Sequence, residues 1–534
     1  MATLAAGGTS TATLSLDAFA SVAVVCDASC NGTLTFTSAA PNLLSNKTFR
    51  LQNKTYGPFG VPGTLSFTVT AGSLTYTPAG NVGGFSYDTS GNITGLAGPN
   101  SSTLKLFNFL PNVSACLGDS LMGQNWSVTG DLTTAIAANT YNGQSRGCLT
   151  WMNFLSGGSF NFIWNGGISG ERTDQILTRA PTVCALGLSW LFENGGTNDV
   201  SQLAAFFSSN ATTCENAIVA NRQAIWAIAK SYNIRVVASS IPPCASSQAW
   251  SATQIGILNR ANRRLRDAAL AAGVIWCDYA AVVTDTTNTS GYALSGSFYD
   301  GLHPNTLGAW NWGKALWTCV QYFASRYTGL ISNQLDSIQS DTSSKQLLTG
   351  VEALFQGSTG AAGGTGMSGT QVSSYTIGRT AGTGTGVASV ITSPDTIGKA
   401  QRVVWTSAAA EDEFRILKAE TPLIATLPAG SAFRFECGVT VTSNTGLRSF
   451  GQFAQVNFTG GAASSPLTSL GMNWTAGDPA IPDTAFSGVL TSPWVRLPSD
   501  ATAITSIRGQ VTPVFASSGG ATIDVYRYGL VKIN

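Results

Sequence analysis

Apolar and polar residues alternate strictly in the first part of the chain. Leu65, Phe67 and Val69, for example, are separated by Ser66 and Thr68. Successive side chains of a β-strand point to opposite faces, so this spacing predicts strands that bury one face. We therefore predict an N-terminal β-sandwich over residues 1–105.

Between residues 106 and 330 the pattern changes to short apolar runs separated by longer segments with helical spacing. Leu258, Ala261, Leu265 and Ala269 recur every three or four residues and stop before Gly273, a residue typical of helix ends. The apolar runs that we predict to be buried strands are residues 113–117, 160–163, 183–188, 234–238 and 274–279. Alternating strands and helices predict an α/β domain with a parallel sheet flanked by helices.

The remaining residues divide into two further regions. Residues 331–399 lack periodicity and are rich in Gly, Ser and Thr, which predicts a linker and loop-rich segment. Within it, residues 352–357 resemble a picornaviral protease recognition site, and they are either an inserted site or native sequence. Alternation returns around Phe433, Phe435 and Val439, which predicts a C-terminal, jelly-roll-like β-sandwich over residues 400–534.

Length and charge agree with this multidomain reading and exclude several classes of protein. A chain of 534 residues exceeds one usual core, so we expect about two to four domains. The formal charge is only +1, which leaves no field to hold a polyanion, so we expect no nucleic-acid partner. Apolar runs are shorter than the roughly 20 residues that cross a bilayer, so we expect no membrane insertion.

Composition also bears on export and on metal binding. Only 10% of the residues are charged and 59 are Gly, which is typical of extracellular β-proteins. The first basic residue is Lys47, so we expect no conventional secretory signal. One His and ten scattered Cys do not suit a usual Cys/His zinc site, and we expect no metal and no cofactor.

A single histidine restricts the candidate chemistry. His303 lies three residues after Asp300, and a histidine-dependent enzyme would have to use it. Ser120 lies in a Gly-Asp-Ser-Leu segment directly after the apolar run 113–117. Ligands of parallel sheets bind at the carboxyl ends of strands, so this position suits a reactive serine.

Two further segments, residues 165–170 and 196–199, follow predicted strands and complete an ordered set of four blocks. The set resembles the SGNH hydrolases, also called the GDSL esterase family, over about residues 106–330. The resemblance implies Ser120 as nucleophile, His303 as general base and Asp300 as the residue that orients it. It also implies an oxyanion hole made by the N–H groups of Ser120 and Gly170 and the side-chain amide of Asn198. The alternative for Asn198 is a helix N-cap.

A second serine competes for the nucleophile role. Ser145 lies in a Gly-x-Ser-x-Gly segment, which fits the nucleophile elbow of α/β-hydrolases. That elbow needs a buried strand before the serine, whereas residues 132–141 are rich in Ala and Thr. We therefore favour Ser120.

The family resemblance implies cleavage of an ester, often a small acyl group on a sugar. Residues 56–63 and the C-terminal region resemble modules of bacteriophage tail proteins. We therefore expect a serine esterase that removes O-acetyl groups from a host cell-surface polysaccharide. We expect it to be a homotrimeric tail fibre or tailspike on the virion, and its partners to be other virion tail proteins. The alternatives are a secreted bacterial carbohydrate esterase and a structural receptor-binding tail protein with an inactive hydrolase domain.

The two flanking regions carry further expectations. Trp405, Trp474 and Trp494 either stack on sugar rings or pack in the protein core. Because all four blocks lie within residues 106–330, both flanks are expected to be dispensable for hydrolysis of a small ester.

Overall fold

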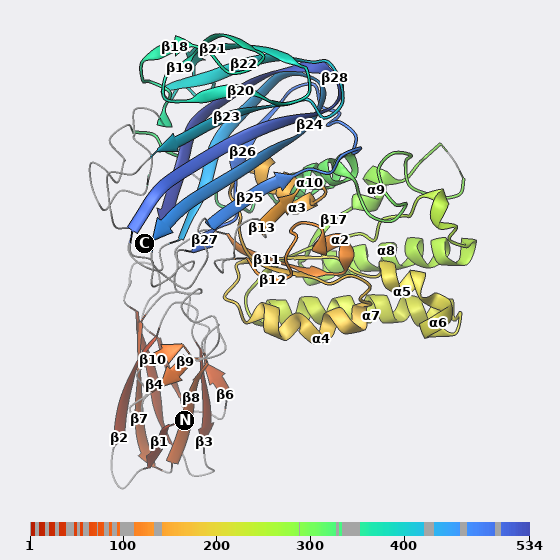
Figure 1. Ribbon diagram of the computed structural model, residues 1–534. Coiled ribbons are helices and arrows are strands. Elements are labelled where there is room, and N and C mark those ends of the chain that lie inside the picture. The colour runs from red at the N-terminus through yellow and green to blue at the C-terminus, as the bar shows by residue number, and fades with distance from the viewer. Residues whose placement is uncertain are drawn as a thin grey trace. The chain divides into compact units, whose positions relative to one another are not determined.

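The computed structural model contains two units, one of residues 1–108 with the segment 184–187, and one of residues 109–183 and 188–534 (Figure 1). In the first unit the structure describes ten strands. In the second it describes residues 112–132, 141–287, 289–326, 330–333, 346, 353–420, 432–459, 467–496 and 503–533.

The first unit is built from antiparallel strands. One sheet has the order β1 (Ala2–Ala5), β8 (Ser73–Ala79), β3 (Ser21–Cys26), β6 (Lys54–Tyr56), and the other has the order β2 (Ser10–Leu16), β7 (Gly63–Ala71), β4 (Asn31–Ser38), β5 (Lys47–Arg50). A separate hairpin joins β9 (Phe85–Tyr87) and β10 (Ile93–Leu96). Leu34 and Phe67 pair across β4 and β7, and both are fully buried. The predicted strand-rich character of this region is confirmed, whereas residues 57–62, used for the tail-protein resemblance, lie outside the described residues.

A six-stranded sheet forms the centre of the α/β region. Its order is β12 (Gly130–Asp131), β14 (Asn161–Gly167), β11 (Val113–Gly118), β15 (Trp190–Glu193), β16 (Arg235–Ser239), β17 (Ile275–Cys277). All neighbours are parallel except β12, which is antiparallel to β14. The chain adds β14 on one side of β11 and all later strands on the other side. The sheet order therefore reverses at β11, and ligands of such sheets bind at the carboxyl ends of the strands there.

Helices cover both faces of this sheet. Figure 1 shows α4 (Thr173–Cys184) and α7 (Ala211–Ser231) on one side of the strands and α3 (Cys148–Leu155) and α10 (Thr306–Val320) on the other. Helix α8 (Ala252–Ala272) packs against α7, and α3 packs against α10. The helix predicted from the spacing of Leu258 and Ala261 is α8, which ends at Gly273 in the left-handed conformation. The shorter helices are α2 (Ser120–Gly123), α5 (Thr197–Ser201), α6 (Leu203–Phe207), η1 (Ser246–Gln248) and α9 (Tyr279–Val283).

One predicted strand of the α/β region is wrong. The apolar run 183–188 was expected to be a strand, but α4 continues through Cys184 and the strand β15 begins at Trp190. Ile176, Ala180 and Val183 are all buried and recur at helical spacing, so the start of the run belongs to the apolar face of a helix.

The C-terminal region consists of two sheet layers that share two long strands, β24 (Ala432–Thr459) and β28 (Ala503–Ile533). In one layer the first half of β24 pairs with β26 (Phe486–Thr491) and β27 (Val495–Arg496), and the second half of β28 pairs with β22 (Lys399–Ser407). In the other layer the second half of β24 pairs with β25 (Leu467–Asn473), and the first half of β28 pairs with β23 (Glu413–Glu420).

Both layers contribute to a single apolar core. Phe433 and Phe435 from the first half of β24 share this core with Leu447 and Phe450 from the second half. The sheet-rich character of residues 400–534 is thus confirmed, and the jelly-roll connectivity stays a prediction. Strand β13 (Tyr141–Gln144) of the hydrolase region pairs with β25 and extends this sheet.

The predicted linker over residues 331–399 is wrong for its second half. Strands β18 (Thr359–Ala361), β19 (Met367–Val372), β20 (Thr376–Ala381) and β21 (Thr385–Thr392) occupy it. Val372, Ile377 and Ala388 of these strands lie in the C-terminal core. Few of the other residues are apolar, so the alternation of apolar and polar positions was too weak to predict the strands. Phe355 is fully buried and its ring lies 4.5 Å from that of Tyr375, so the end of segment 352–357 packs as part of the fold.

Candidate active site

Ser120 lies where a buried strand meets a short helix. Every residue of β11 is buried, and the strand ends at Gly118. A Cβ atom on Gly118 would lie 2.4 Å from the carbonyl oxygen of Asn194, so only glycine fits this close approach of two chain segments. Asp119 is the N-cap of α2 and accepts a hydrogen bond from the N–H of Leu121 at 3.0 Å. These contacts place Ser120, which is partly exposed, as the first residue of α2.

The structure brings Ser120, His303 and Asp300 together in one hydrogen-bonded chain. Nε2 of His303 lies 2.8 Å from Oγ of Ser120, and Nδ1 lies 2.7 Å from Oδ2 of Asp300. Oδ1 of Asp300 also accepts hydrogen bonds from the backbone N–H groups of Leu302 and His303, at 3.0 and 2.8 Å. This geometry suits a neutral imidazole that donates from Nδ1 to Asp300 and accepts from Ser120 at Nε2.

The environment of Asp300 keeps its carboxyl group ionised. Burial alone would raise the pKa of Asp300, but hydrogen bonds from the backbone and ring of His303 and from Leu302 outweigh burial and lower the pKa below its ordinary value. An ionised Asp300 holds the Nδ1–H tautomer of His303 and stabilises the imidazolium that forms when Nε2 takes a proton.

The three groups expected to form an oxyanion hole lie in different segments. Ser120 begins α2, so its N–H has no acceptor within the helix. Gly170 has a φ of +81°, a conformation that favours glycine, and within the described part of the chain its N–H donates to no protein group. Asn198 is the second residue of α5, and its side-chain amide donates to the carbonyl oxygen of Glu171 at 2.9 Å.

The helix-cap alternative for Asn198 is wrong. The N-cap of α5 is Gly196, and no side chain caps this helix. The hydrogen bond from Asn198 to Glu171 instead joins the segment after β15 to the segment that carries Gly170. Asp199 reinforces this junction because its carboxylate accepts from both the N–H and the hydroxyl of Thr173, at 2.9 and 2.7 Å.

A buried ion pair supports the segment that carries Asn198. Glu193, the last residue of β15, pairs with Arg222 of α7 at 2.7 Å, and both side chains are fully buried. Arg222 also donates to the carbonyl oxygen of Gly195 at 3.3 Å, and Trp226 donates to Glu193 at 3.0 Å. Sequence analysis missed this pair because its members are 29 residues apart and neither lies in a motif.

A second group of residues missed by sequence analysis surrounds His303. The ring of Tyr299 stacks on that of His303, with centroids 5.8 Å apart and an interplanar angle of 18°. The guanidinium carbon of Arg146 lies 3.8 Å from the centroid of Tyr299, and Gln124 donates a hydrogen bond to the Tyr299 hydroxyl at 3.0 Å. Tyr299 directly precedes Asp300, and that position was its only signal in the sequence.

The competing serine, Ser145, is placed differently. It is fully buried, and its Oγ lies 3.0 Å from the hydroxyl of Thr306. The strand before it, β13, pairs with β25 of the C-terminal sheet and not with the parallel sheet. Ser145 therefore lacks the geometry of a nucleophile elbow.

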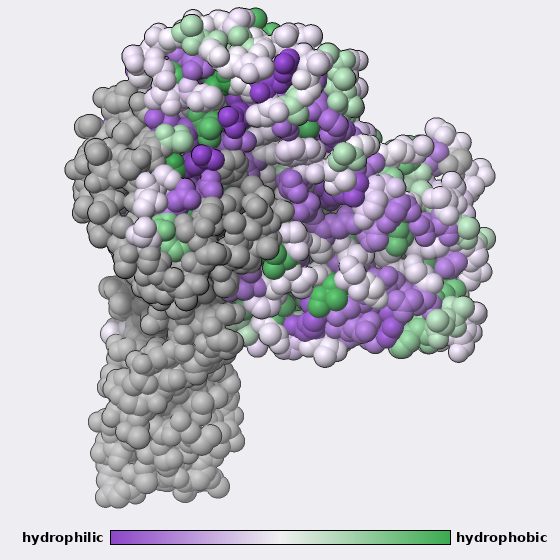
Figure 2. All heavy atoms as spheres, in the orientation of Figure 1, coloured by the Kyte–Doolittle hydropathy of each residue, from purple (hydrophilic) through white to green (hydrophobic). Residues whose placement is uncertain are grey.

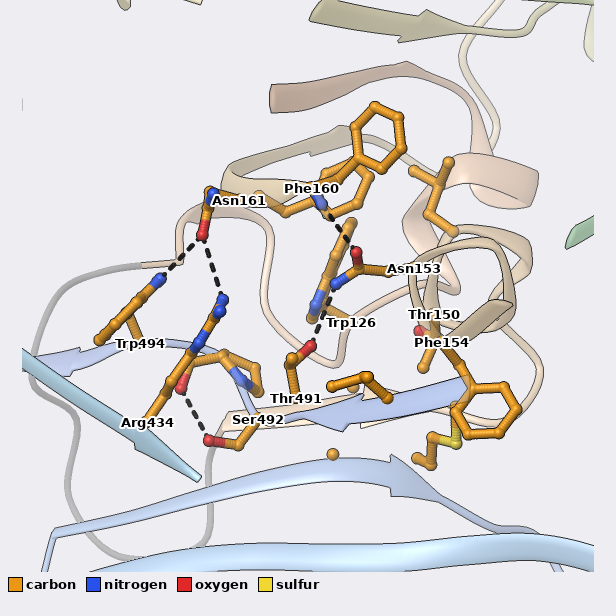
Figure 3. A pocket seen from close by; sticks show the side chains of 17 residues that line it. Trp126, Thr150, Asn153, Phe154, Phe160, Asn161, Arg434, Thr491, Ser492 and Trp494 are labelled. Atoms are coloured by element: carbon orange, nitrogen blue, oxygen red, sulfur yellow. Dashed lines mark hydrogen bonds between the residues drawn. The ribbon is translucent and has the colours of Figure 1, made fainter. Parts of the chain in front are cut away.

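A pocket lies where the hydrolase region meets the C-terminal sheet, but neither Ser120 nor His303 lines it (Figure 3). Its polar side chains hydrogen-bond to one another: Asn161 accepts from Arg434 at 3.1 Å and from Trp494 at 3.3 Å, and Asn153 donates to Thr491 at 3.1 Å. These contacts join the two regions across the pocket.

Of the two alternatives for the three tryptophans, packing in the protein core is confirmed for Trp405 and Trp494. Trp405 is only 1% exposed and Trp494 only 4%, so both pack in the protein interior. Trp474 is half-buried.

The described residues offer neither a metal site nor a membrane-spanning helix. Within those residues, no cluster of three or more His, Cys, Asp or Glu side chains is arranged to hold a metal ion. The helices described here are also all too short or too polar to cross a membrane.

One known protein family matches the part of the chain that carries this site. Residues 116–310 match the model of the GDSL-like lipase/acylhydrolase family. Residues 116–310 therefore form a GDSL-type hydrolase domain, and the protein is a carboxylic ester hydrolase.

Solved structures similar to the chain include a GDSL-like lipase from Bacteroides thetaiotaomicron, with 17% identity over 41% of this chain and 96% of that one and a TM-score of 0.29. They also include the acetylxylan esterase Axe2 from Geobacillus stearothermophilus. The two sequences are 12% identical, the match covers 40% of this chain and 94% of Axe2, and the TM-score is 0.33. The search of curated proteins gives no match.

Proposed function

We propose that this carboxylic ester hydrolase is a serine esterase that removes O-acetyl groups from a host cell-surface polysaccharide. The observation that carries the proposal is the hydrogen-bonded chain from Ser120 through His303 to Asp300, with both ring nitrogens of His303 within 2.8 Å of their partners. In this reading Ser120 is the nucleophile, His303 the general base and Asp300 the residue that orients and stabilises the imidazole.

The proposed reaction has two balanced steps. Oγ of Ser120 attacks the acetyl carbonyl carbon while Nε2 of His303 takes the hydroxyl proton, and the sugar alcohol then leaves with that proton. A water molecule attacks the resulting acetyl-serine, gives a proton to His303, and releases acetate as Ser120 recovers its proton. The N–H groups of Ser120 and Gly170 and the amide of Asn198 stabilise the oxyanion in both steps.

The described surface supports a polar substrate. In the coloured part of the face drawn in Figure 2, hydrophobic residues form small scattered areas between hydrophilic ones, whereas binding to a lipid surface needs a contiguous apolar area. Tyr299 beside His303 is 44% exposed, and Phe206, which lies over Arg172 near Gly170, is 50% exposed. An arginine lies over each of these rings, and the parts of the rings that stay exposed offer apolar contact area to a sugar ring.

The wider setting is part of the same proposal. The enzyme acts as a homotrimeric tail fibre or tailspike on a phage virion, and the N-terminal sheets contact other virion tail proteins. Support comes from the two sheet-rich regions that flank the hydrolase domain and from a composition with only 10% charged residues. Mass spectrometry of purified virions and light scattering of the purified protein test this setting. A monomer absent from virions would contradict it.

The substrate is tested by acetate release from an O-acetylated bacterial surface polysaccharide. We expect the wild-type chain to release acetate and Ser120→Ala to release none, with the chemically deacetylated polysaccharide as control. Turnover of a small chromogenic acetyl ester without acetate release from any acetylated polysaccharide would contradict the substrate class.

A further inference from the structure

One carboxylate of the C-terminal region reaches the segment that carries the proposed catalytic histidine. Asp478 lies between β25 and β26 and is only 3% exposed. Its Oδ2 accepts hydrogen bonds from the N–H and the hydroxyl of Thr306, at 3.2 and 3.0 Å. Thr306 is the first residue of α10 and lies three residues after His303. A negative charge at this helix end is favourable because the helix dipole is positive there.

The same carboxylate also holds Arg146, which contacts the other side of the histidine segment. Nε and Nη2 of Arg146 donate to the two oxygens of Asp478, at 2.9 and 2.6 Å, in a bidentate pair. Burial alone would lower the pKa of Arg146, but the hydrogen bond and charge of Asp478 outweigh it and raise the pKa. The guanidinium therefore stays charged where it covers the ring of Tyr299.

Tyr299, which Arg146 covers, contacts His303 in two ways. Its ring stacks on the imidazole, and its backbone N–H donates to the carbonyl oxygen of His303 at 3.0 Å. Asp478 thus contacts the histidine segment at both ends, through Thr306 after His303 and through Arg146 and Tyr299 before it.

The turn that carries Asp478 is itself fixed to the C-terminal sheet. Arg448 of β24 is 1% exposed and donates to the backbone carbonyl of Asp478 at 2.6 Å, and it pairs with Glu411 at 2.7 Å. The segment with Arg146 is anchored nearby, because the N–H of Ser145 donates to the carbonyl of Asn473 at 2.8 Å. Both partners are therefore held by ordered backbone.

We propose that the C-terminal sheet region completes the active site, with Asp478 as a positioning residue that sets the distance from His303 to Ser120. The inference rests on the proposed serine esterase reaction and deepens it. It also reverses the expectation that the C-terminal flank is dispensable for hydrolysis of a small ester.

The chain offers a matched control on the same helix. Asp483, also between β25 and β26, pairs with Lys314 of α10 at 2.6 Å. Lys314 lies eight residues beyond Thr306, about 12 Å along the helix axis, so its ion pair joins the same two regions without contacting the histidine segment.

The experiment compares Asp478→Asn and Asp483→Asn in the full-length protein, with kcat and KM measured on a small acetyl ester and the thermal midpoint as a check of folding. Asn keeps an acceptor for Thr306 but loses the charge that holds Arg146. We expect Asp478→Asn to lower kcat by about 10²-fold with KM nearly unchanged, because a shift of about 1 Å in a catalytic group has an effect of this size. Asp483→Asn should keep kcat within about two-fold of wild type.

A second variant keeps the test decisive if Asp478→Asn folds poorly. Arg146→Gln should lower kcat in the same way, and the double variant should lose no more than the stronger single variant, because both act through one contact. Wild-type kcat in folded Asp478→Asn and Arg146→Gln would overturn the positioning role and leave the esterase proposal standing. A wild-type protein without ester turnover would overturn both.

Discussion

Asp119 makes the stability of the protein depend on pH in a direction opposite to that of most carboxylates. The residue is fully buried, and one of its oxygens, Oδ2, has no hydrogen-bond partner within the described residues. Burial outweighs the hydrogen bond from Leu121 and raises the pKa of Asp119 from 3.8 to about 7. We predict that Asp119→Asn stabilises the protein relative to wild type, and increasingly so as the pH rises.

The magnitude follows from the two pKa values. Between pH 3.8 and about 7 the folded state keeps the proton that the unfolded chain has lost, so the free energy of unfolding falls as pH rises and levels off above pH 7. Within this window the free energy of unfolding falls by about 1.4 kcal/mol for each pH unit, and two such units lie between pH 5 and pH 7. Because Asn does not ionise, the stability of Asp119→Asn minus that of wild type should grow by about 2.7 kcal/mol between pH 5 and pH 8.

Urea unfolding followed by tryptophan fluorescence at pH 5 and pH 8 measures this difference. The first of the 13 tryptophans is Trp126, so the signal comes from the larger unit. Asp412→Asn is the control, because three backbone N–H groups bind Asp412 and lower its pKa despite burial, so its titration lies below pH 5. The difference in free energy of unfolding between Asp412→Asn and wild type should be the same at pH 5 and at pH 8. If the difference between Asp119→Asn and wild type were also the same at both pH values, the raised pKa of Asp119 would be refuted.

Four further substitutions test the site and its support. Ser120→Ala should abolish hydrolysis of a chromogenic acetyl ester and Ser145→Ala should leave most of it; the opposite ranking would transfer the nucleophile role to Ser145. Asn198→Ala should lower kcat by about 10²- to 10³-fold, roughly 2.7 to 4 kcal/mol, with little change in KM, and an unchanged kcat in the folded variant would exclude it from the oxyanion hole. Arg222→Met should destabilise the protein by about 3 to 5 kcal/mol in urea unfolding because Glu193 is left buried without its partner, and a loss below about 1 kcal/mol would show that this pair contributes little.

Local patterns were sufficient to predict the elements that carry the site. The strand before Ser120 is apolar at nearly every position because both faces of a central parallel strand are buried. The three-residue spacing of Asp300 and His303 lets one turn bring the carboxylate to the ring, so sequence neighbours become hydrogen-bonded partners. The order of the four blocks then indicated which distant segments meet.

Other features depend on contacts that no local pattern records. The run 183–188 is apolar in either a strand or a helix, and the structure decides between them because Val183 is buried on the same face of α4 as Ile176 and Ala180. The strands between 359 and 392 are short and rich in Gly and Thr, and they form because β22 pairs with β21 and β23 pairs with β20. Asp478 is separated from Thr306 by 172 residues, so its place beside the histidine segment follows from the fold of two regions together.

The central claim is that His303 activates Ser120 for nucleophilic attack, and covalent labelling tests it most directly. A fluorophosphonate reacts with an activated serine because the serine oxygen bonds to phosphorus and displaces fluoride. Peptide mass spectrometry of the labelled wild-type protein should place the phosphonyl group on Ser120, and His303→Ala should lose the label. Labelling of a different serine, or equal labelling of Ser120 when His303 is absent, would contradict the account.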